Sequence, residues 1–333
     1  MNSTKYDVVG IGNAIVDVIA QTDYEFLTKH DLTKGSMALV DEAQAQLIYN
    51  AMGPAMEISG GSAANTIAGI ASLGGCGAYI GKVKADQLGD VFRHDIRAGG
   101  VAFDTAPATE GPQTARSFIL VTPDAQRTMN TYLGACVNLT PEDVDPEVIA
   151  GSSVTYLEGY LWDPPLAKEA FRKAMNIAHD SGRKVALTLS DSFCVDRFRE
   201  EFLDLAENAV DILFANDDEI CSLYQVETFD EALQHVRQHC EIAALTRSEH
   251  GSVVISGEEV HIIEAQPVER LEDATGAGDL YAAGFLHGHT HGQDLATCGR
   301  WGSIAASEVI SHIGARPQTP LRELIASTSG GAV

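Results

Sequence analysis

A glycine-rich turn runs directly into a series of small apolar residues between Glu272 and Leu286, with the sequence EDATGAGDLYAAGFL. If a helix begins in this turn, the backbone N–H groups of Gly276, Ala277 and Gly278 can surround an anion. Asp279 follows at once, and its carboxylate can take a proton from an attacking hydroxyl while the amides stabilise a transferred phosphoryl group. The string predicts an anion hole with a general base. A capped helix after a tight turn explains the same string without chemistry.

Two further polar positions lie in the first 65 residues. Asn13 and Asp17 follow a short apolar run that begins at Tyr6, and a carboxylate there can accept hydrogen bonds from two vicinal hydroxyls. Asn65 ends the string GGSAAN, which begins with Gly60 and Gly61, and glycine lets the backbone approach a ligand closely. A solvated turn and a glycine-rich helix start remain the alternatives that carry no function.

A third group follows an apolar run at residues 211–215, where Asn216 and Glu219 stand three residues apart. Amide and carboxylate oxygens suit Mg²⁺, which retains several waters. The same pair also matches a helix N-cap with acidic residues in the first turn, and both interpretations can hold together.

Strands and helices alternate along most of the chain, which favours parallel βαβ units. Ligands then bind beyond the carboxyl ends of the strands, in the strand-to-helix loops. The expected strands cover residues 6–12, 16–20, 154–157, 184–189, 211–215 and 242–245, and the expected helices cover 41–52, 62–73 and 166–179.

Two stretches interrupt this alternation, at residues 16–40 and 101–134. The second contains two strand-like runs, 115–121 and 127–133, without a helix between them. We therefore predict an α/β core formed by 1–15, 41–100 and 135–333. The interrupting stretches, 16–40 and 101–134, are predicted to form a small β lid.

The 333 residues include 22 Lys and Arg against 47 Asp and Glu, a net charge of −25. Such a surface repels nucleic acid and anionic lipid, so neither is expected as a partner. No apolar run reaches the roughly 20 residues that span a bilayer, and no signal-peptide pattern opens the chain. Six scattered cysteines without a C-x-x-C pair predict free thiols. A cytoplasmic protein is expected.

Other motifs in the sequence give weaker indications of function. The GIGNAI string after the first strand lacks the third glycine of a dinucleotide fingerprint, and no GxxxxGK[ST] string occurs. The spacings His287-x-His289-x-His291 and His235-xxx-His239 resemble metal-ligand spacings. Without acidic or cysteine partners in a recognisable pattern, histidines at the end of a helix are the favoured interpretation, because imidazoles interact well with the dipole there.

The strings ATGAGD and GGSAAN together are similar to the two signatures of the ribokinase-like, or PfkB, carbohydrate kinase family. The resemblance implies a mostly parallel central sheet flanked by helices on both faces, with a small β-sheet lid. It also implies transfer of a phosphoryl group from ATP to a hydroxyl. The roles that it implies are a base at Asp279, a diol clamp at Asp17 and Asn13, and contacts to ATP or Mg²⁺ at Asn216, Glu219, Thr246 and Thr275. No dedicated protein cage for the metal is expected, since Asn216 and Glu219 would hold Mg²⁺ through water.

Within the family, the resemblance is nearest to adenosine kinases. Arg127 matches an arginine that they fold over the active site, and Phe193 falls where an aromatic lies near the base pocket. Adenosine is then the expected acceptor, with AMP and ADP as products. Inosine, guanosine, ribose and fructose remain alternative acceptors, and a non-catalytic nucleoside-binding protein is a further alternative. The resemblance leaves a K⁺ requirement and the choice between monomer and homodimer open.

Overall fold

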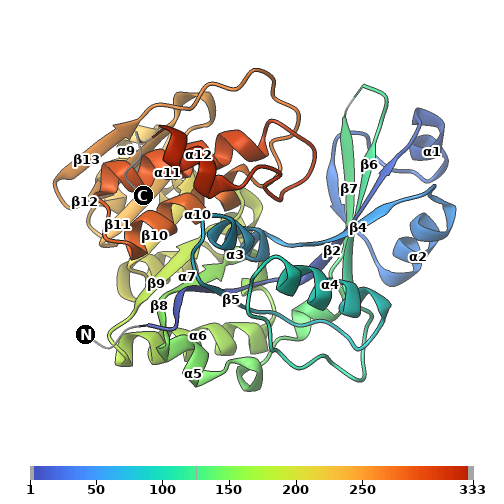
Figure 1. Ribbon diagram of the computed structural model, residues 1–333, viewed down its shortest axis with the longest axis horizontal. Coiled ribbons are helices and arrows are strands. Elements are labelled where there is room, and N and C mark those ends of the chain that lie inside the picture. The colour runs from blue at the N-terminus through green and yellow to red at the C-terminus, as the bar shows by residue number, and fades with distance from the viewer. Residues whose placement is uncertain (1–3, 125, 329–333) are drawn as a thin grey trace.

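A large twisted sheet of eight strands forms the centre of the computed structural model, which describes residues 4–124 and 126–328 (Figure 1). Six strands are parallel to one another, whereas β12 pairs antiparallel with β11, and β13 pairs antiparallel with β12. Because the parallel strands end at one edge, the loops that follow them meet there. In spatial order the strands are β13 (Glu259–Ile263), β12 (Ser252–Ser256), β11 (Ile242–Thr246), β10 (Ile212–Asn216), β9 (Lys184–Thr188), β8 (Ser152–Glu158), β1 (Tyr6–Ile11) and β5 (Gly77–Ile80).

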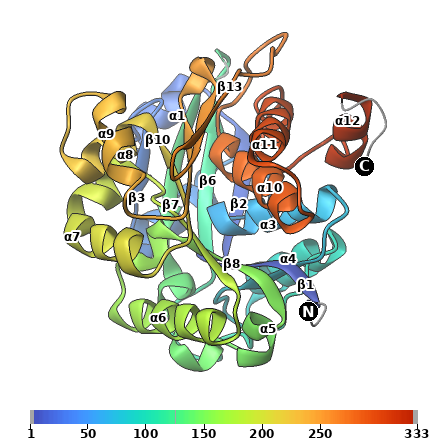
Figure 2. The same cartoon turned by 90° about the vertical axis from the view of Figure 1, so that its left-hand side faces the viewer.

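Helices cover both faces of this sheet, as the alternating pattern predicts (Figure 2). Successive side chains of a strand point to opposite faces. In β10, Ile212 and Phe214 pack in one buried cluster with residues of α3, α10 and α11, whereas Leu213 and Ala215 pack in the other with residues of α5 to α9. The helices on the first face are α3 (Ser62–Ser72), α10 (Ala277–Thr290) and α11 (Leu295–Val309), with α4 (Gln87–Ala98) and α12 (Leu321–Thr328) beside them. Those on the second face are α5 (Pro146–Ala150), α6 (Pro165–Asp180), α7 (Ser192–Asn208), α8 (Asp217–Tyr224) and α9 (Phe229–Val236).

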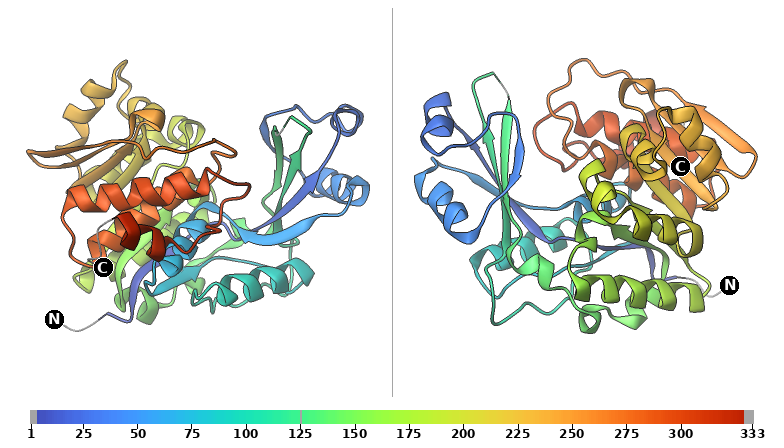
Figure 3. Two further views of the ribbon diagram at one scale, coloured as in Figure 1. Left: turned by 45° about the horizontal axis from the view of Figure 1, so that its top comes forward. Right: turned by 180° about the vertical axis from the view of Figure 1, so that it is seen from behind.

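A second, five-stranded sheet stands beside this core and carries two helices on its outer side (Figures 1 and 3). We call it the small sheet. Its strands in order are β3 (Met37–Leu39), β7 (Arg127–Tyr132), β6 (Ala115–Val121), β2 (Ile15–Gln21) and β4 (Met56–Gly60), and its helices are α1 (Tyr24–Lys29) and α2 (Glu42–Ala51).

The small sheet differs from the predicted lid in three segments. Residues 42–51, expected in the core, form α2 on its outer side. Residues 56–60, also expected in the core, form β4, which pairs antiparallel with β2 along Ile15–Ile19. Residues 101–108, expected in the lid, run along the edge of the large sheet, where Ala102 exchanges backbone hydrogen bonds with Gly77 and Tyr79 of β5. The last two assignments depend on pairing between distant segments, which local pattern does not encode.

Two expectations from composition can be compared with the structure. Each of the six cysteines is a free thiol, and three of them, Cys136, Cys194 and Cys298, are buried. Over residues 4–124 and 126–328, no helix combines the length and the apolar character that crossing a membrane requires.

Candidate active site

The first turn of α10 carries the predicted anion hole. Gly276 is the N-cap of this helix and has φ +83°, a left-handed conformation that glycine adopts without strain. The Ala277 N–H bonds weakly back to Ala274 O at 3.2 Å, while for Gly276 and Gly278 no backbone acceptor occurs among the described residues. The two glycine N–H groups are therefore available to an anion, as helix geometry dictates.

Asp279 lies in the same turn and is held at both carboxylate oxygens. The Ser62 hydroxyl donates to Oδ1 at 2.6 Å, and the Asn65 amide donates to Oδ2 at 2.9 Å. Burial raises the pKa of Asp279 above its ordinary value, while the two hydrogen bonds and Arg316 oppose that rise. The arrangement joins the two signature strings, which are more than 200 residues apart in the chain.

Asp17, on β2, lies directly over the glycine pair that precedes α3. A Cβ atom at Gly60 would come within 2.3 Å of Asp17 Oδ2, so only glycine leaves room for this carboxylate. Gly61 has φ +97°, and a Cβ there would overlap the backbone oxygen of Asn13. Burial raises the pKa of Asp17 to about 7, with a further contribution from the negative charge of Asp279. The two carboxylates therefore share one site.

Asn13 is buried and bound to Glu158, a residue that the sequence analysis did not identify. Glu158 Oε1 accepts the side-chain amide of Asn13 at 2.8 Å and its backbone N–H at 3.2 Å, while Oε2 accepts the Ala63 N–H at 2.9 Å. Asn13 Oδ1 and Asn65 Oδ1 are buried without a partner among the described residues, so both retain capacity for a ligand. The only signal for Glu158 in the sequence is its position at the end of a predicted strand.

Arg316 is the second residue that sequence reasoning missed. Its guanidinium donates to Ser59 O at 3.0 Å, Ala64 O at 2.9 Å and Ser59 Oγ at 3.1 Å, beside the glycine pair. Burial lowers the pKa of Arg316, while Asp95, Asp17 and Asp279 counteract the effect. Arg316 thus supplies positive charge to a site that contains two partly buried carboxylates.

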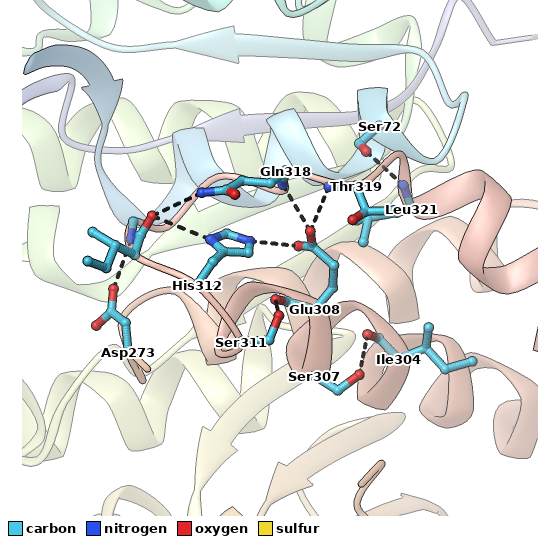
Figure 4. A network of polar contacts seen from close by, with 12 residues as sticks. Ser72, Asp273, Ile304, Ser307, Glu308, Ser311, His312, Gln318, Thr319 and Leu321 are labelled. Atoms are coloured by element: carbon cyan, nitrogen blue, oxygen red, sulfur yellow. Dashed lines mark hydrogen bonds and ion pairs between the residues drawn. The ribbon is translucent and has the colours of Figure 1, made fainter. Parts of the chain in front are cut away.

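A buried carboxylate on α11, that of Glu308, holds the loop that carries Arg316 (Figure 4). Glu308 Oε1 accepts the backbone N–H groups of Gln318 at 2.9 Å and Thr319 at 2.7 Å, and Oε2 lies 3.2 Å from His312 Nε2. These bonds fix both ends of the loop, so Glu308 positions Arg316 without contacting the site itself.

Arg127 reaches from β7 of the small sheet to the anion-hole loop, where it forms an ion pair with Asp273. Asp273 also accepts the N–H groups of Thr275 at 3.0 Å and Gly314 at 3.1 Å, which ties Thr275 into the turn before α10. Two guanidinium nitrogens of Arg127 are buried without a partner among the described residues. A groove lined by Gly35, Asp124, Gln126, Arg127 and residues 270–275 lies at this junction.

Asn216 and Glu219 form a reciprocal capping box at the start of α8. The Asn216 side chain accepts the Glu219 N–H at 2.8 Å and donates to Glu219 Oε1 at 2.7 Å, while Oε2 accepts the Asn216 N–H at 3.0 Å. Thr246 is next to Asn216, because β10 and β11 pair with these two residues in register. Burial and the nearby charges of Asp191, Asp218 and Asp217 raise the pKa of Glu219 to about 7.

The aromatic side chains near the site divide into two kinds. Phe193, at the start of α7, is 64% exposed, and the Arg197 guanidinium lies 5.4 Å from its ring centre. Tyr160 is also exposed, and its hydroxyl donates to Ser190 O at 3.0 Å. Trp162, by contrast, is fully buried against Phe171 and belongs to the core. Of these rings, Phe193 and Tyr160 are the ones that a ligand can reach.

The site therefore combines a carboxylate that can accept a proton, free N–H groups at a helix start and a second carboxylate that can bind hydroxyls. This set suits transfer of a phosphoryl group to an alcohol, in which donors stabilise charge on the transferred group.

The family model for "pfkB family carbohydrate kinase" matches residues 38–322, most of the chain. The chain belongs to the pfkB family. An adenosine kinase structure from Sinorhizobium meliloti is 55% identical, covers 98% of this chain and 100% of its own, and has a TM-score of 0.90. A structure described as a probable sugar kinase from Rhizobium etli is 54% identical, covers 98% of this chain and 99% of its own, and has a TM-score of 0.91. The adenosine kinase of Saccharomyces cerevisiae is 24% identical and covers 92% of this chain and 95% of its own.

This pfkB kinase is thus an enzyme that phosphorylates a nucleoside or a sugar, with ATP as the phosphoryl donor. Its ribokinase-like α/β fold, with a second small sheet, is the one that the sequence predicts. Kinases of this family usually require Mg²⁺. The donor set near Glu219 fits such an ion held through water, because both Glu219 oxygens are already bonded to Asn216 and further acidic side chains lie nearby.

Proposed function

We propose that this enzyme is an adenosine kinase, which transfers the γ-phosphoryl group of ATP to the 5′-hydroxyl of adenosine. The observation that carries the proposal is the contact of Asp279 with Ser62 and Asn65, which puts a candidate base beside the glycine pair that Asp17 covers. The 55% identity to an adenosine kinase over 98% of the chain supports the same acceptor.

In the proposed reaction Asp279 takes the proton of the 5′-hydroxyl as its oxygen attacks the γ-phosphorus. The bond between that phosphorus and the β–γ bridging oxygen breaks, and ADP leaves. The free N–H groups of Gly276 and Gly278 stabilise the charge on the transferred group, and the weakly bonded Ala277 N–H joins them when it turns from Ala274 O. Mg²⁺, when bound, neutralises phosphate charge.

The nucleoside is proposed to lie between the two signature strings. Asp17 accepts hydrogen bonds from the 2′- and 3′-hydroxyls, and the unpaired amide oxygens of Asn13 and Asn65 offer further acceptors. Gly60 and Gly61 leave space for the ribose, and the exposed ring of Phe193 stacks on the base.

ATP is proposed to bind along the edge formed by Thr246, Asn216, Glu219 and Thr275. The small sheet brings Arg127 toward the phosphates, because its ion pair with Asp273 already holds it beside the anion-hole loop. We propose that this sheet moves over the bound substrate as a lid.

A second candidate acceptor is a free sugar, such as ribose or fructose. The description of the Rhizobium etli relative as a probable sugar kinase favours it. Inosine and guanosine carry the same ribose as adenosine and can make the same ribose contacts. Selection among the nucleosides therefore depends on contacts with the base.

Initial phosphorylation rates with Mg-ATP against adenosine, inosine, guanosine, ribose and fructose test the proposal. We expect kcat/KM to be highest for adenosine and to fall when Phe193 is replaced by alanine, with no fall for ribose. A higher kcat/KM for a free sugar would keep the kinase chemistry and contradict the adenosine assignment. Turnover of none of the five would favour a nucleoside-binding protein.

The pH dependence of catalysis tests the role of Asp17. Its pKa is raised to about 7, so Asp17 becomes protonated as the pH falls through 7. The protonated carboxyl group then accepts hydrogen bonds from the ribose hydroxyls less well. We expect kcat/KM for adenosine to drop about tenfold between pH 8 and pH 6, mainly through KM. With 2′-deoxyadenosine, which lacks the vicinal diol, the KM component should shrink. A KM for adenosine that stays constant over this range would contradict the diol clamp.

A further inference from the structure

The far end of α10 meets the start of β1 at a cluster of three potential metal ligands. His287 lies in the last turns of α10, His291 four residues on is the C-cap of this helix, and Asp7 lies on β1. One ligand atom from each residue lies within 4.8 Å of the others. The sequence showed the two histidines but not Asp7, which is 280 positions away from His287.

His287 is built into this cluster with an unused ring nitrogen. The residue is 6% exposed, and its Nδ1 is buried without a hydrogen-bond partner among residues 4–124 and 126–328. A Cβ atom at Gly75 would lie 2.9 Å from Asp7 Oδ2 and 3.0 Å from His287 Nδ1, so both atoms border the space that this glycine leaves. A buried nitrogen that lacks a partner carries a desolvation cost, which a ligand placed there would remove.

The other two residues are held in orientations that suit ligation. His291 Nδ1 lies 2.8 Å from the backbone oxygen of His287, a contact that requires a proton on Nδ1 and leaves the lone pair on Nε2 free. Asp7 Oδ2 accepts the Cys76 N–H at 2.7 Å, which fixes the carboxylate. Backbone hydrogen bonds of this kind orient the ligands in known metal sites.

We propose that Asp7, His287 and His291 bind a divalent transition-metal ion of the zinc, cobalt or nickel class. Two imidazoles and one carboxylate favour these ions over Mg²⁺ and Ca²⁺, which prefer oxygen ligands alone. Three protein ligands leave a further position for water, and the exposed His291 gives the ion a path from solvent. The net charge of −25 attracts cations in general, whereas Arg322, beside Gly74, opposes a cation locally.

A metal here would act on the helix that carries the proposed base. Helix α10 begins at the anion hole and ends at this cluster, so an ion would tie its last turn to β1 and to the turn at Gly75. The expected effect is on stability and is independent of the acceptor that the enzyme uses.

The test uses the full chain, treated with a chelator and then titrated with Zn²⁺ by calorimetry without nucleotide or Mg²⁺. We expect one equivalent to bind and to raise the unfolding temperature. His291→Ala should weaken binding at least tenfold and abolish the rise, and Asp7→Asn should weaken it as well. His289→Ala is the matched control on the same helix turn, outside the cluster, and should behave as the unmodified chain. Because His291 is exposed, its replacement should leave the fold intact.

Three outcomes would overturn the proposal. The first is no binding by the unmodified chain. The second is equal binding by His291→Ala and His289→Ala. The third is binding that survives His291→Ala but is lost in Cys76→Ser, which would assign the ion to the exposed thiol instead. Visible absorption of bound Co²⁺ that disappears in His291→Ala would support imidazole ligation directly.

Discussion

Replacing Asp279 by asparagine is expected to lower kcat by about 10²- to 10⁴-fold, the contribution that a positioned general base makes. The asparagine amide cannot accept the proton of the attacking hydroxyl. The fold should survive, because the Ser62 hydroxyl can reverse its hydrogen bond and the Asn65 amide can turn its unpaired oxygen toward the new donor. Initial rates and thermal unfolding of the same preparation measure both effects.

The control for this variant is Asp230→Asn, which makes the same chemical change at an exposed position in the first turn of α9. It should retain full activity. If Asp279→Asn keeps kcat within tenfold of the unmodified enzyme, Asp279 is not the base. If both activity and unfolding temperature fall sharply, the loss reflects the fold, and Asp279→Glu is then needed to compare a displaced carboxylate with an absent one.

Replacing Gly278 by alanine keeps the backbone N–H but adds a methyl group where a phosphate would approach. We expect kcat to fall by about 10²- to 10³-fold, as it does when one donor is kept from the developing charge. A Cβ atom at Gly278 meets nothing within 4 Å, so it would project into the open space before the first turn of α10. The backbone is helical there, and alanine is a better helix former than glycine by about 1 kcal/mol. Activity should therefore fall without loss of stability.

Substitutions at two other glycines separate the effect on activity from the effect on stability. Gly53→Ala, at an exposed loop position that is equally open, should change neither activity nor stability. Gly276→Ala should reduce stability as well as activity, because Gly276 has φ +83° and its Cβ would lie 2.8 Å from that of Ala315. Unchanged kcat in Gly278→Ala, measured at saturating ATP and adenosine, would show that no phosphate oxygen approaches this turn.

Local pattern accounts for much of this protein. Continuous apolar runs in segments such as 212–215 indicate strands buried on both faces, and capping residues such as Asp41 mark helix starts where the structure has them. The glycine-rich string 276–279 predicts a helix start with free N–H groups, which α10 provides. These features depend on neighbours in the chain, so the sequence shows them directly.

The partners of the site residues are decided by tertiary structure instead. Glu158 under Asn13 and Arg316 beside Ser59 come from segments about 145 and 257 residues away in the chain. Neither belongs to a motif, because a buried ion or hydrogen-bonded carboxylate is defined by what surrounds it and not by its neighbours in the chain.

The sequence by itself determined the α/β class and the string that carries the proposed base and anion hole, because strand periodicity and helix-start chemistry are local. Only the tertiary structure decided that residues 56–60 pair with β2, that Phe193 is exposed while Trp162 is buried, and that Asp7 meets His287. Strand pairing and side-chain burial depend on how distant segments pack, and that packing is a property of the whole chain.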